Sequence, residues 1–180
     1  MHPYRKETEG RVDITQHEAA SPFSPLVRFL FGANVVYAQN RLGRQLFPSI
    51  LVHVENLGDV ARKDGGWCGT RGESRRLEGF SIRLPRDIGD VRVTYRCHLQ
   101  NSGDTPWLDE GQFCGTRGKS LRLEGFEVRL QGSAKSRFSI VYQAHLQDSG
   151  DTGMFRDGEY AGTRGQSRRV EAMRVWLEQR

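Results

Sequence analysis

Apolar and polar residues alternate along several stretches of the chain. Between residues 91 and 99 the apolar side chains occupy every second position, at Val91, Val93, Tyr95, Cys97 and Leu99. Residues 138–146 repeat this pattern, and residues 121–130 alternate again. Alternation over this length is typical of a β-strand that buries one face. Because no helical period is present between residues 47 and 180, the pattern predicts an all-β domain.

Three copies of one sequence unit follow one another along the chain. Each copy contains a Gly-Thr-Arg-Gly tetrad, and the tetrads begin at Gly69, Gly115 and Gly162, which are 46 and 47 residues apart. The similarity extends upstream, where TYRCHLQNSGD matches VYQAHLQDSGD and, more weakly, ILVHVENLGD. Internal similarity at this period is the signature of a repeat architecture.

The pattern within each unit predicts about three strands, so three units would supply about nine. One unit cannot bury its apolar face alone, whereas three units around a shared axis can, and closure removes exposed sheet edges. We therefore expect a pseudo-threefold, β-prism-like domain, with a β-trefoil as the alternative. The domain would cover residues 47–180, with units at about 47–85, 91–131 and 138–178.

Residues 1–46 do not repeat and form an N-terminal tail and non-repeated segment. Residues 1–24 are polar, which is typical of a tail or linker. The first ten residues lack an apolar run, so we expect no signal peptide there. Residues 26–47 carry enough apolar side chains to pack as a helix or as an extra strand, and the sequence leaves both open.

The charge and hydropathy of the chain limit the classes of partner that we expect. It carries 27 basic and 22 acidic residues, a net charge of +5, and no block of Lys and Arg. Because the excess of basic residues is not concentrated in one segment, we do not expect a nucleic-acid partner. The longest apolar stretch, around Phe29–Ala38, is broken by Gly32 and Asn34 and is far shorter than the roughly 20 residues of a membrane span.

The three cysteines, Cys68, Cys97 and Cys114, cannot all pair within one chain. None stands in a Cys-x-x-Cys motif, so the spacing excludes a zinc ribbon and a thioredoxin-like site. Cys68 and Cys114 occupy a position that holds Ala161 in the third unit. A small buried side chain accounts for both, and we expect all three thiols to be free and largely buried.

One set of residues recurs at matching positions of the units. The third unit supplies Tyr142, Ala144, His145, Gly158, Gly162, Thr163, Gly165, Arg169, Glu171 and Ala172, and the second supplies Tyr95, His98, Trp107, Gly111, Gly115, Thr116, Gly118, Arg122 and Glu124. Together they resemble the clostridial hydrophobic-W (ChW) repeat, in which Tyr-x-Ala-His and a Gly-Trp precede a second Trp, a Gly-x-x-x-Gly-Thr-x-Gly turn and an Arg-x-Glu-Ala strand. The resemblance covers residues from about 47 to 178.

The units depart from that motif at its two tryptophans. Asp59, Asp104 and Asp151 replace the Trp that follows the first Gly. Of the second Trp only Trp107 remains, with Met154 in the third unit. The resemblance implies an extracellular or cell-surface protein that binds a polysaccharide or a protein partner.

Three equivalent histidines, His53, His98 and His145, lie opposite the apolar faces of their strands. Three interpretations are open: each His bridges neighbouring strands or units, each contacts a ligand, or the three share one metal ion on the axis. No second type of metal ligand repeats at a useful spacing, so we expect no metal and no cofactor.

An Arg-x-Glu pair begins the last strand of each unit. The pairs are Arg76 and Glu78, Arg122 and Glu124, and Arg169 and Glu171. A buried carboxylate needs a paired cation and hydrogen bonds, so we interpret these residues as structural ion pairs at the unit boundaries. Three equivalent copies argue against an enzyme, because one active site needs groups with different roles. The sequence also contains no nucleophile elbow, phosphate loop or HExxH motif.

The loops carry the candidate binding residues. In each unit an Asp follows the first strand, and an aromatic residue (Trp67, Phe113 or Tyr160) precedes an Arg inside the glycine turn. Carboxylates and guanidiniums beside an aromatic platform suit a shallow sugar site, while a turn role for Asp and a core role for the aromatic rings are the alternatives. The candidate ligand-binding residues are Asp59, Asp104, Trp107, Asp151, Arg71, Arg117, Arg164, His53, His98 and His145.

The sequence therefore predicts a non-catalytic, lectin-like recognition module. It would bind a glycan or cell-surface polysaccharide through up to three related loop sites, which together would act through avidity. The alternative is a protein-interaction or adhesion module whose loops only maintain the fold. A third alternative, an anion or nucleic-acid binder that uses the Arg series, is opposed by the interspersed acidic residues.

Overall fold

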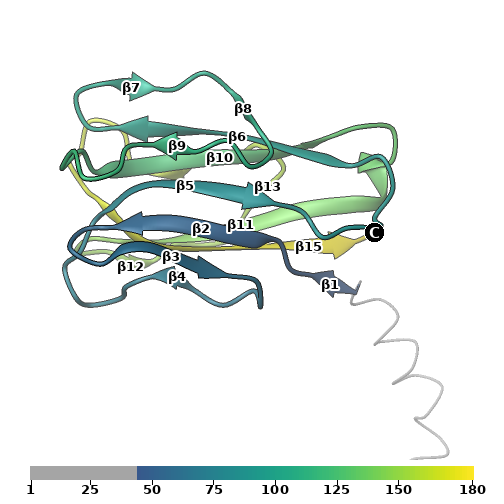
Figure 1. Ribbon diagram of the computed structural model, residues 1–180, viewed down its shortest axis with the longest axis horizontal. Helices are drawn as coiled ribbons and strands as arrows, with labels where there is room; N and C mark the ends of the chain where they lie inside the picture. Colours follow the sequence, from purple (N-terminus) through teal and green to yellow (C-terminus); the bar gives the residue numbers. More distant parts are fainter. Residues whose placement is uncertain (1–43) are drawn as a thin grey trace, which may run out of the picture. The chain divides into compact units, whose positions relative to one another are not determined.

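The computed structural model describes residues 44–180, and their long strands run side by side along the horizontal of Figure 1. Most of the segment for which a helix or an extra strand was open therefore lies outside the described residues. At its end, β1 (Gln45–Leu46) pairs antiparallel with β15 (Val170–Gln179). This short extra strand extends the sheet of the third unit.

Each unit is built on one antiparallel pair of long strands. The pairs are β2 (Ser49–Val54) with β5 (Leu77–Arg83), β6 (Arg92–Leu99) with β10 (Leu123–Gln131), and β11 (Phe138–Leu146) with β15. A single 3-10 turn, η1 (Lys135–Arg137), separates β10 from β11. The predicted alternation is confirmed, because Val93, Tyr95 and Cys97 of β6 point inward and are at most 1% exposed.

The outer edge of each pair differs between the units. In unit 1, β3 (Gly58–Arg62) runs unbroken along β2. Units 2 and 3 divide this edge into short strands, which are β7 (Gly103–Asp104), β8 (Leu108–Asp109), β12 (Gly150–Asp151) and β13 (Phe155–Arg156). At each break a Thr hydroxyl replaces the missing partner, since Thr105 Oγ1 and Thr152 Oγ1 accept the N–H groups of Cys97 and Ala144.

One short strand of every sheet comes from a neighbouring unit. The exchanged strands are β4 (Cys68–Gly69), which pairs with β15, β9 (Cys114–Gly115), which pairs with β5, and β14 (Ala161–Gly162), which pairs with β10. Unit 1 thus gives a strand to the sheet of unit 3, unit 3 gives one to unit 2, and unit 2 gives one to unit 1. The three exchanges together link the units in a closed ring. The expectation of three strands per unit missed this contribution.

Glycine is required where these strands cross between units. Gly115 has φ of 116°, and a Cβ there would overlap the backbone carbonyl of Glu78. Gly69 and Gly162 make the same close approach to their partner strands. Only a residue without a side chain permits this conformation and this contact, which explains the glycine that opens each tetrad.

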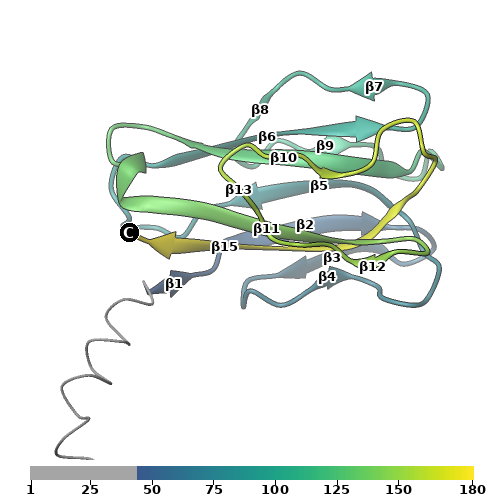
Figure 2. The ribbon, with the colours of Figure 1, turned by 180° about the vertical axis from the view of Figure 1, so that it is seen from behind.

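The three sheets meet in one aromatic core. The ring centroids of Phe80 and Phe126 lie 5.4 Å apart, and Tyr95 and Tyr142 pack beside them. Figure 2 shows the β6–β10 and β11–β15 pairs as separate layers of the domain. The sheets are not closed into a barrel, so the arrangement is the predicted three-unit β-prism rather than a β-trefoil.

Candidate functional site

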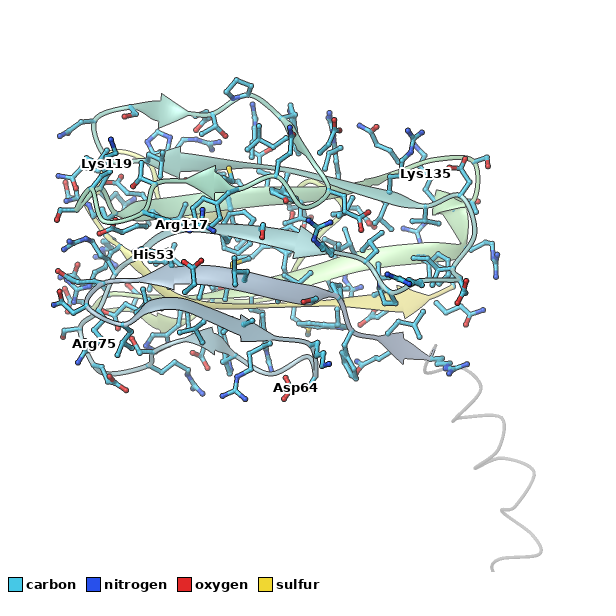
Figure 3. The ribbon with its side chains drawn as sticks, viewed as in Figure 1. His53, Asp64, Arg75, Arg117, Lys119 and Lys135 are labelled. Carbon is cyan, nitrogen blue, oxygen red and sulfur yellow. The ribbon has the colours of Figure 1, made fainter. Side chains whose placement is uncertain are left out.

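Two candidate binding residues of unit 1, His53 and Asp59, form a cluster with Arg117 of unit 2 on the outer face of the unit 1 sheet. Nδ1 of His53 is 2.7 Å from Oδ1 of Asp59, and Nε of Arg117 donates to both carboxylate oxygens at 3.1 Å. His53 lies in β2, whereas Arg117 follows β9 of unit 2, and Figure 3 shows the two on the same side of the domain. The cluster therefore joins two units across their boundary.

The same cluster is present at the other two boundaries. His98 and Arg164 both contact the carboxylate of Asp104, and His145 and Arg71 both contact that of Asp151. In each case His and Asp come from one unit and Arg from the next. The three clusters thus form a closed ring that follows the strand exchange.

The position of the histidines excludes one of the three interpretations of their role. Each is bonded to an Asp of its own unit and lies on a different outer face, so His53, His98 and His145 do not converge on an axis. The shared axial metal is therefore wrong. Within residues 44–180 no three side chains of His, Cys, Asp or Glu gather in a way that could hold a metal ion.

The aromatic residue before each glycine turn is covered by the Arg of the same turn. The guanidinium carbon of Arg117 lies 3.5 Å from the centroid of the Phe113 ring, and Arg164 lies at the same distance from Tyr160. The ring of Phe113 also packs closely over Gly79 of unit 1. With one side covered by Arg117 and the ring edge against Gly79, the half-buried Phe113 contributes packing between the units and does not belong to the core.

Contacts in the folded domain lower the pKa of two boundary carboxylates, Asp59 and Asp104. The hydrogen bond from Arg117 is the main cause of a lowered pKa at Asp59, and His53 adds to it. At Asp104 burial acts to raise the pKa, but hydrogen bonds from Arg164 and His98 outweigh burial and lower it. Each of these carboxylates therefore already has two partners within the protein before any ligand is considered.

A second set of contacts at each boundary is buried. Glu78 is 2% exposed, and it accepts hydrogen bonds from Arg76 of its own unit and from the backbone N–H groups of Lys119 and Ser120 in unit 2. Its counterparts Glu124 and Glu171 are bonded to Arg122 and Arg169. These are the structural ion pairs that the Arg-x-Glu pattern predicted.

The ring of Trp107 is also covered by guanidiniums, but they belong to the long strands of its own unit and not to a glycine turn. It lies between β7 and β8 on the outer face of unit 2, with the guanidinium carbons of Arg129 and Arg96 at 3.7 and 5.0 Å from its ring centroid. Glu127 accepts hydrogen bonds from Arg96 at 3.0 Å and from Arg164 at 2.8 Å. Trp107 thus lies in a polar surface that includes two guanidiniums.

Sequence reasoning missed Arg96, Glu127 and Arg129 as part of this surface. The alternation in β6 and β10 placed them on the polar faces of their strands, which is a usable signal. The missing information was the fold of the loop, since nothing in the alternation shows that Trp107 lies against these strands.

The cysteines are free and buried, as predicted. Burial raises the pKa of the Cys68 thiol to about 11. The pKa of Cys97 is raised by its hydrogen bond to Cys114 and by burial. Oγ1 of Thr105 lies 3.3 Å from Sγ of Cys114. These thiols belong to the interior and face no surface site.

Comparison with known protein families gives one result. The sequence model of the family described as clostridial hydrophobic W (ChW) matches residues 53–86, 98–132 and 145–179, which together are more than half of the chain. No curated protein and no solved structure matches the chain. Within residues 44–180 no helix has the length and hydrophobicity needed to cross a membrane.

Proposed function

Because the chain belongs to the clostridial hydrophobic W (ChW) family, we propose that its three repeats form a non-catalytic recognition module that binds carbohydrate on the outer face of unit 2. The observation that carries this proposal is the setting of Trp107. An indole beside the guanidiniums of Arg96 and Arg129 combines an apolar ring with hydrogen-bond donors. A sugar ring has an apolar face and hydroxyl groups at its edge, so it suits such a surface.

The boundary clusters take a supporting part in this proposal. Asp59, Asp104 and Asp151, with their His and Arg partners, hold the units together and thereby fix the faces in place. Asp104 and Arg164 adjoin the Trp107 surface through Glu127 and complete its polar rim. Ligand contacts by the equivalent clusters of units 1 and 3 are not part of the proposal.

A glycan array probed with the purified domain tests this function, followed by calorimetric titration with the glycans that bind. Trp107→Ala should weaken binding at least roughly tenfold, because it removes the stacking surface. The matched control is Met154→Ala, at the equivalent loop position of unit 3, where the side chain is 59% exposed. It should change affinity by less than about twofold. An array on which every bound glycan is unaffected by Trp107→Ala, or no binding to any glycan, would contradict the proposal.

A second candidate function is a protein-interaction or adhesion module. The observation in its favour is that the loop carboxylates are already bonded across the boundaries, while Leu57 and Met154 expose 51% and 59% of their surfaces at loop positions. Exposed apolar side chains at loop tips are suited to a protein partner. This function would be favoured over the first if no glycan on the array binds and if Leu57→Ser and Met154→Ser each abolish the interaction with a protein partner.

A further inference from the structure

The outer face of unit 1 contains a hollow of about 310 Å³. Residues that line it include Ser49, Leu51, Ala61, Ser81, Arg83 and Phe113. The volume is near the lower end of the range for small-ligand sites. It lies on the face that corresponds to the Trp107 surface of unit 2.

The hollow lies where unit 1 lacks a polar pair that the other two units have. Leu51 of β2 faces Ser81 of β5 across the sheet. Units 2 and 3 fill the equivalent positions with bonded polar pairs, Arg96–Glu127 and Gln143–Arg174. Since Leu and Ser cannot form such a bridge and Ser is small, the middle of the face is left open in unit 1.

Arg83 lines this hollow without an acidic partner. Its side chain is exposed, and among residues 44–180 no carboxylate oxygen lies within 4.0 Å of its guanidinium nitrogens. The equivalent Arg129 of unit 2 lies over Trp107, and unit 3 has Trp176 at this position. A planar guanidinium with free N–H groups is the side chain best matched to a carboxylate, which it binds through two parallel hydrogen bonds.

The acidic side chains next to the hollow are already bonded. Asp59 is paired with His53 and with Nε of Arg117, which itself lines the hollow. Glu110 accepts the backbone N–H of Leu84 at 2.9 Å. Of the two charged side chains that line the hollow, Arg117 is paired with Asp59 and Arg83 forms no ion pair among the described residues, while Leu51 and Ala61 supply an apolar floor and Ser49 and Ser81 supply hydroxyls.

From this chemistry we propose that the hollow of unit 1 binds one carboxylate-bearing sugar of an acidic polysaccharide. Arg83 takes the carboxylate, Ser49 and Ser81 bond ring hydroxyls, and the apolar side of the ring lies over Leu51 and Ala61. This inference rests on the proposed carbohydrate function and names the ligand class for a second face. It does not involve Trp107.

The test is calorimetric titration with tetramers of galacturonic acid and of glucuronic acid, each compared with its fully methyl-esterified form. Esterification removes the charge and keeps the sugar, so at least one acid should bind roughly tenfold or more tighter than its ester. Arg83→Gln should remove that difference. The charge-matched control is Arg92→Gln, whose side chain is 68% exposed in unit 2, and it should change affinity by less than about twofold.

A second variant tests the hollow itself. Ser81→Glu introduces the residue that unit 2 carries at this position, which fills the space and offers Arg83 a carboxylate within the protein. It should abolish binding of the acid tetramer. Because Ser81 and Arg83 lie at the surface, both variants should keep the wild-type stability to within about 0.5 kcal/mol. Equal binding of acid and ester, no binding of either acid, or equal effects of Arg83→Gln and Arg92→Gln would each overturn the inference.

The outcomes separate this inference from the proposed function. If array glycans bind through Trp107 but binding of the acid tetramers does not depend on Arg83, the inference is wrong and the proposed function is unaffected. Binding of an acid tetramer that depends on Arg83 and persists in Trp107→Ala, with every array glycan also unaffected by Trp107→Ala, would support the hollow and contradict the assignment to unit 2. A domain that binds no glycan of any kind would overturn both.

Discussion

The boundaries between the units and the outer faces of the units have diverged to different degrees. At every boundary the equivalent His, Asp and Arg side chains form one cluster, a buried Glu pairs with an Arg of its own unit, and a Gly closely approaches the partner strand. The faces differ in their central cross-strand pairs, which are Leu51–Ser81, Arg96–Glu127 and Gln143–Arg174. A contact that recurs three times serves the shared architecture, whereas the surfaces that differ between the units are where we propose that ligands bind.

The largest effect is expected at the glycine crossing between units. Gly115→Ala should destabilise the domain by about 3 kcal/mol, because the new Cβ overlaps the carbonyl of Glu78 and the backbone has a positive φ. Gly118→Ala is the control, since its φ is also positive but nothing lies within 4 Å. It should cost about 1 kcal/mol. Urea unfolding measures both, and equal losses would show that the crossing is not a close contact.

A smaller loss is expected from the buried ion pairs. Glu124→Gln removes the charge that faces Arg122, whose nitrogens lie 2.9 and 2.8 Å from Oε1. With side-chain exposures of 5% and 22%, neither group is well solvated, so stability should fall by about 2 kcal/mol. Glu73→Gln, at a side chain that is 55% exposed, should change stability by less than about 0.5 kcal/mol. If the two variants unfold at the same urea concentration, the buried pairs do not stabilise the boundary.

The exposed clusters should contribute less and should depend on pH. The pKa of Asp104 is lowered by folding, so its stabilising effect is present above its ordinary value of 3.8 and is lost as pH falls through the lower, folded value. Asp104→Asn should therefore cost about 0.5–1 kcal/mol at neutral pH, and this difference from wild type should shrink below about pH 4. Unfolding curves between neutral and acidic pH measure it, and a difference that stays constant would contradict the account.

The three cysteine thiols should not react with reagents in solution while the domain is folded. In the folded domain Cys68, Cys97 and Cys114 should resist iodoacetamide at mildly alkaline pH, because all three are buried and the pKa of Cys68 is raised to about 11. After denaturation, non-reducing mass spectrometry should find three alkylated thiols. A species two hydrogens lighter, with only one alkylated thiol, would reveal an intramolecular disulfide instead.

Alternation and repetition were enough to predict the strands and the three-unit prism. The inward face of β6 could be predicted because hydrophobic burial imposes a period of two on any strand that covers a core. The exchange of β4, β9 and β14 could not be predicted, since a two-residue strand has no period and its partner is fixed by closure of the whole ring.

The candidate site was predicted in part for a related reason. The repeat spacing identified the His, Asp and Arg positions that recur in each unit. It did not show that the Arg of one unit, such as Arg117, reaches the Asp of the preceding unit, here Asp59. The hollow in unit 1 was also not predicted from the sequence. It depends on the polar bridge that Leu51 and Ser81 cannot form, unlike the equivalent residues about 45 positions further on.

The most direct test of this comparison measures stability and affinity together in two variants. Trp107→Ala changes a face, and Asp151→Asn changes a boundary cluster in a different unit. Against the tightest glycan from the array, Trp107→Ala should lose at least roughly tenfold in affinity at nearly unchanged Tm. Asp151→Asn should lower the Tm by a few degrees while its affinity stays within about twofold of wild type. The opposite result, with affinity lost in Asp151→Asn and kept in Trp107→Ala, would place binding in the recurring clusters and contradict the account.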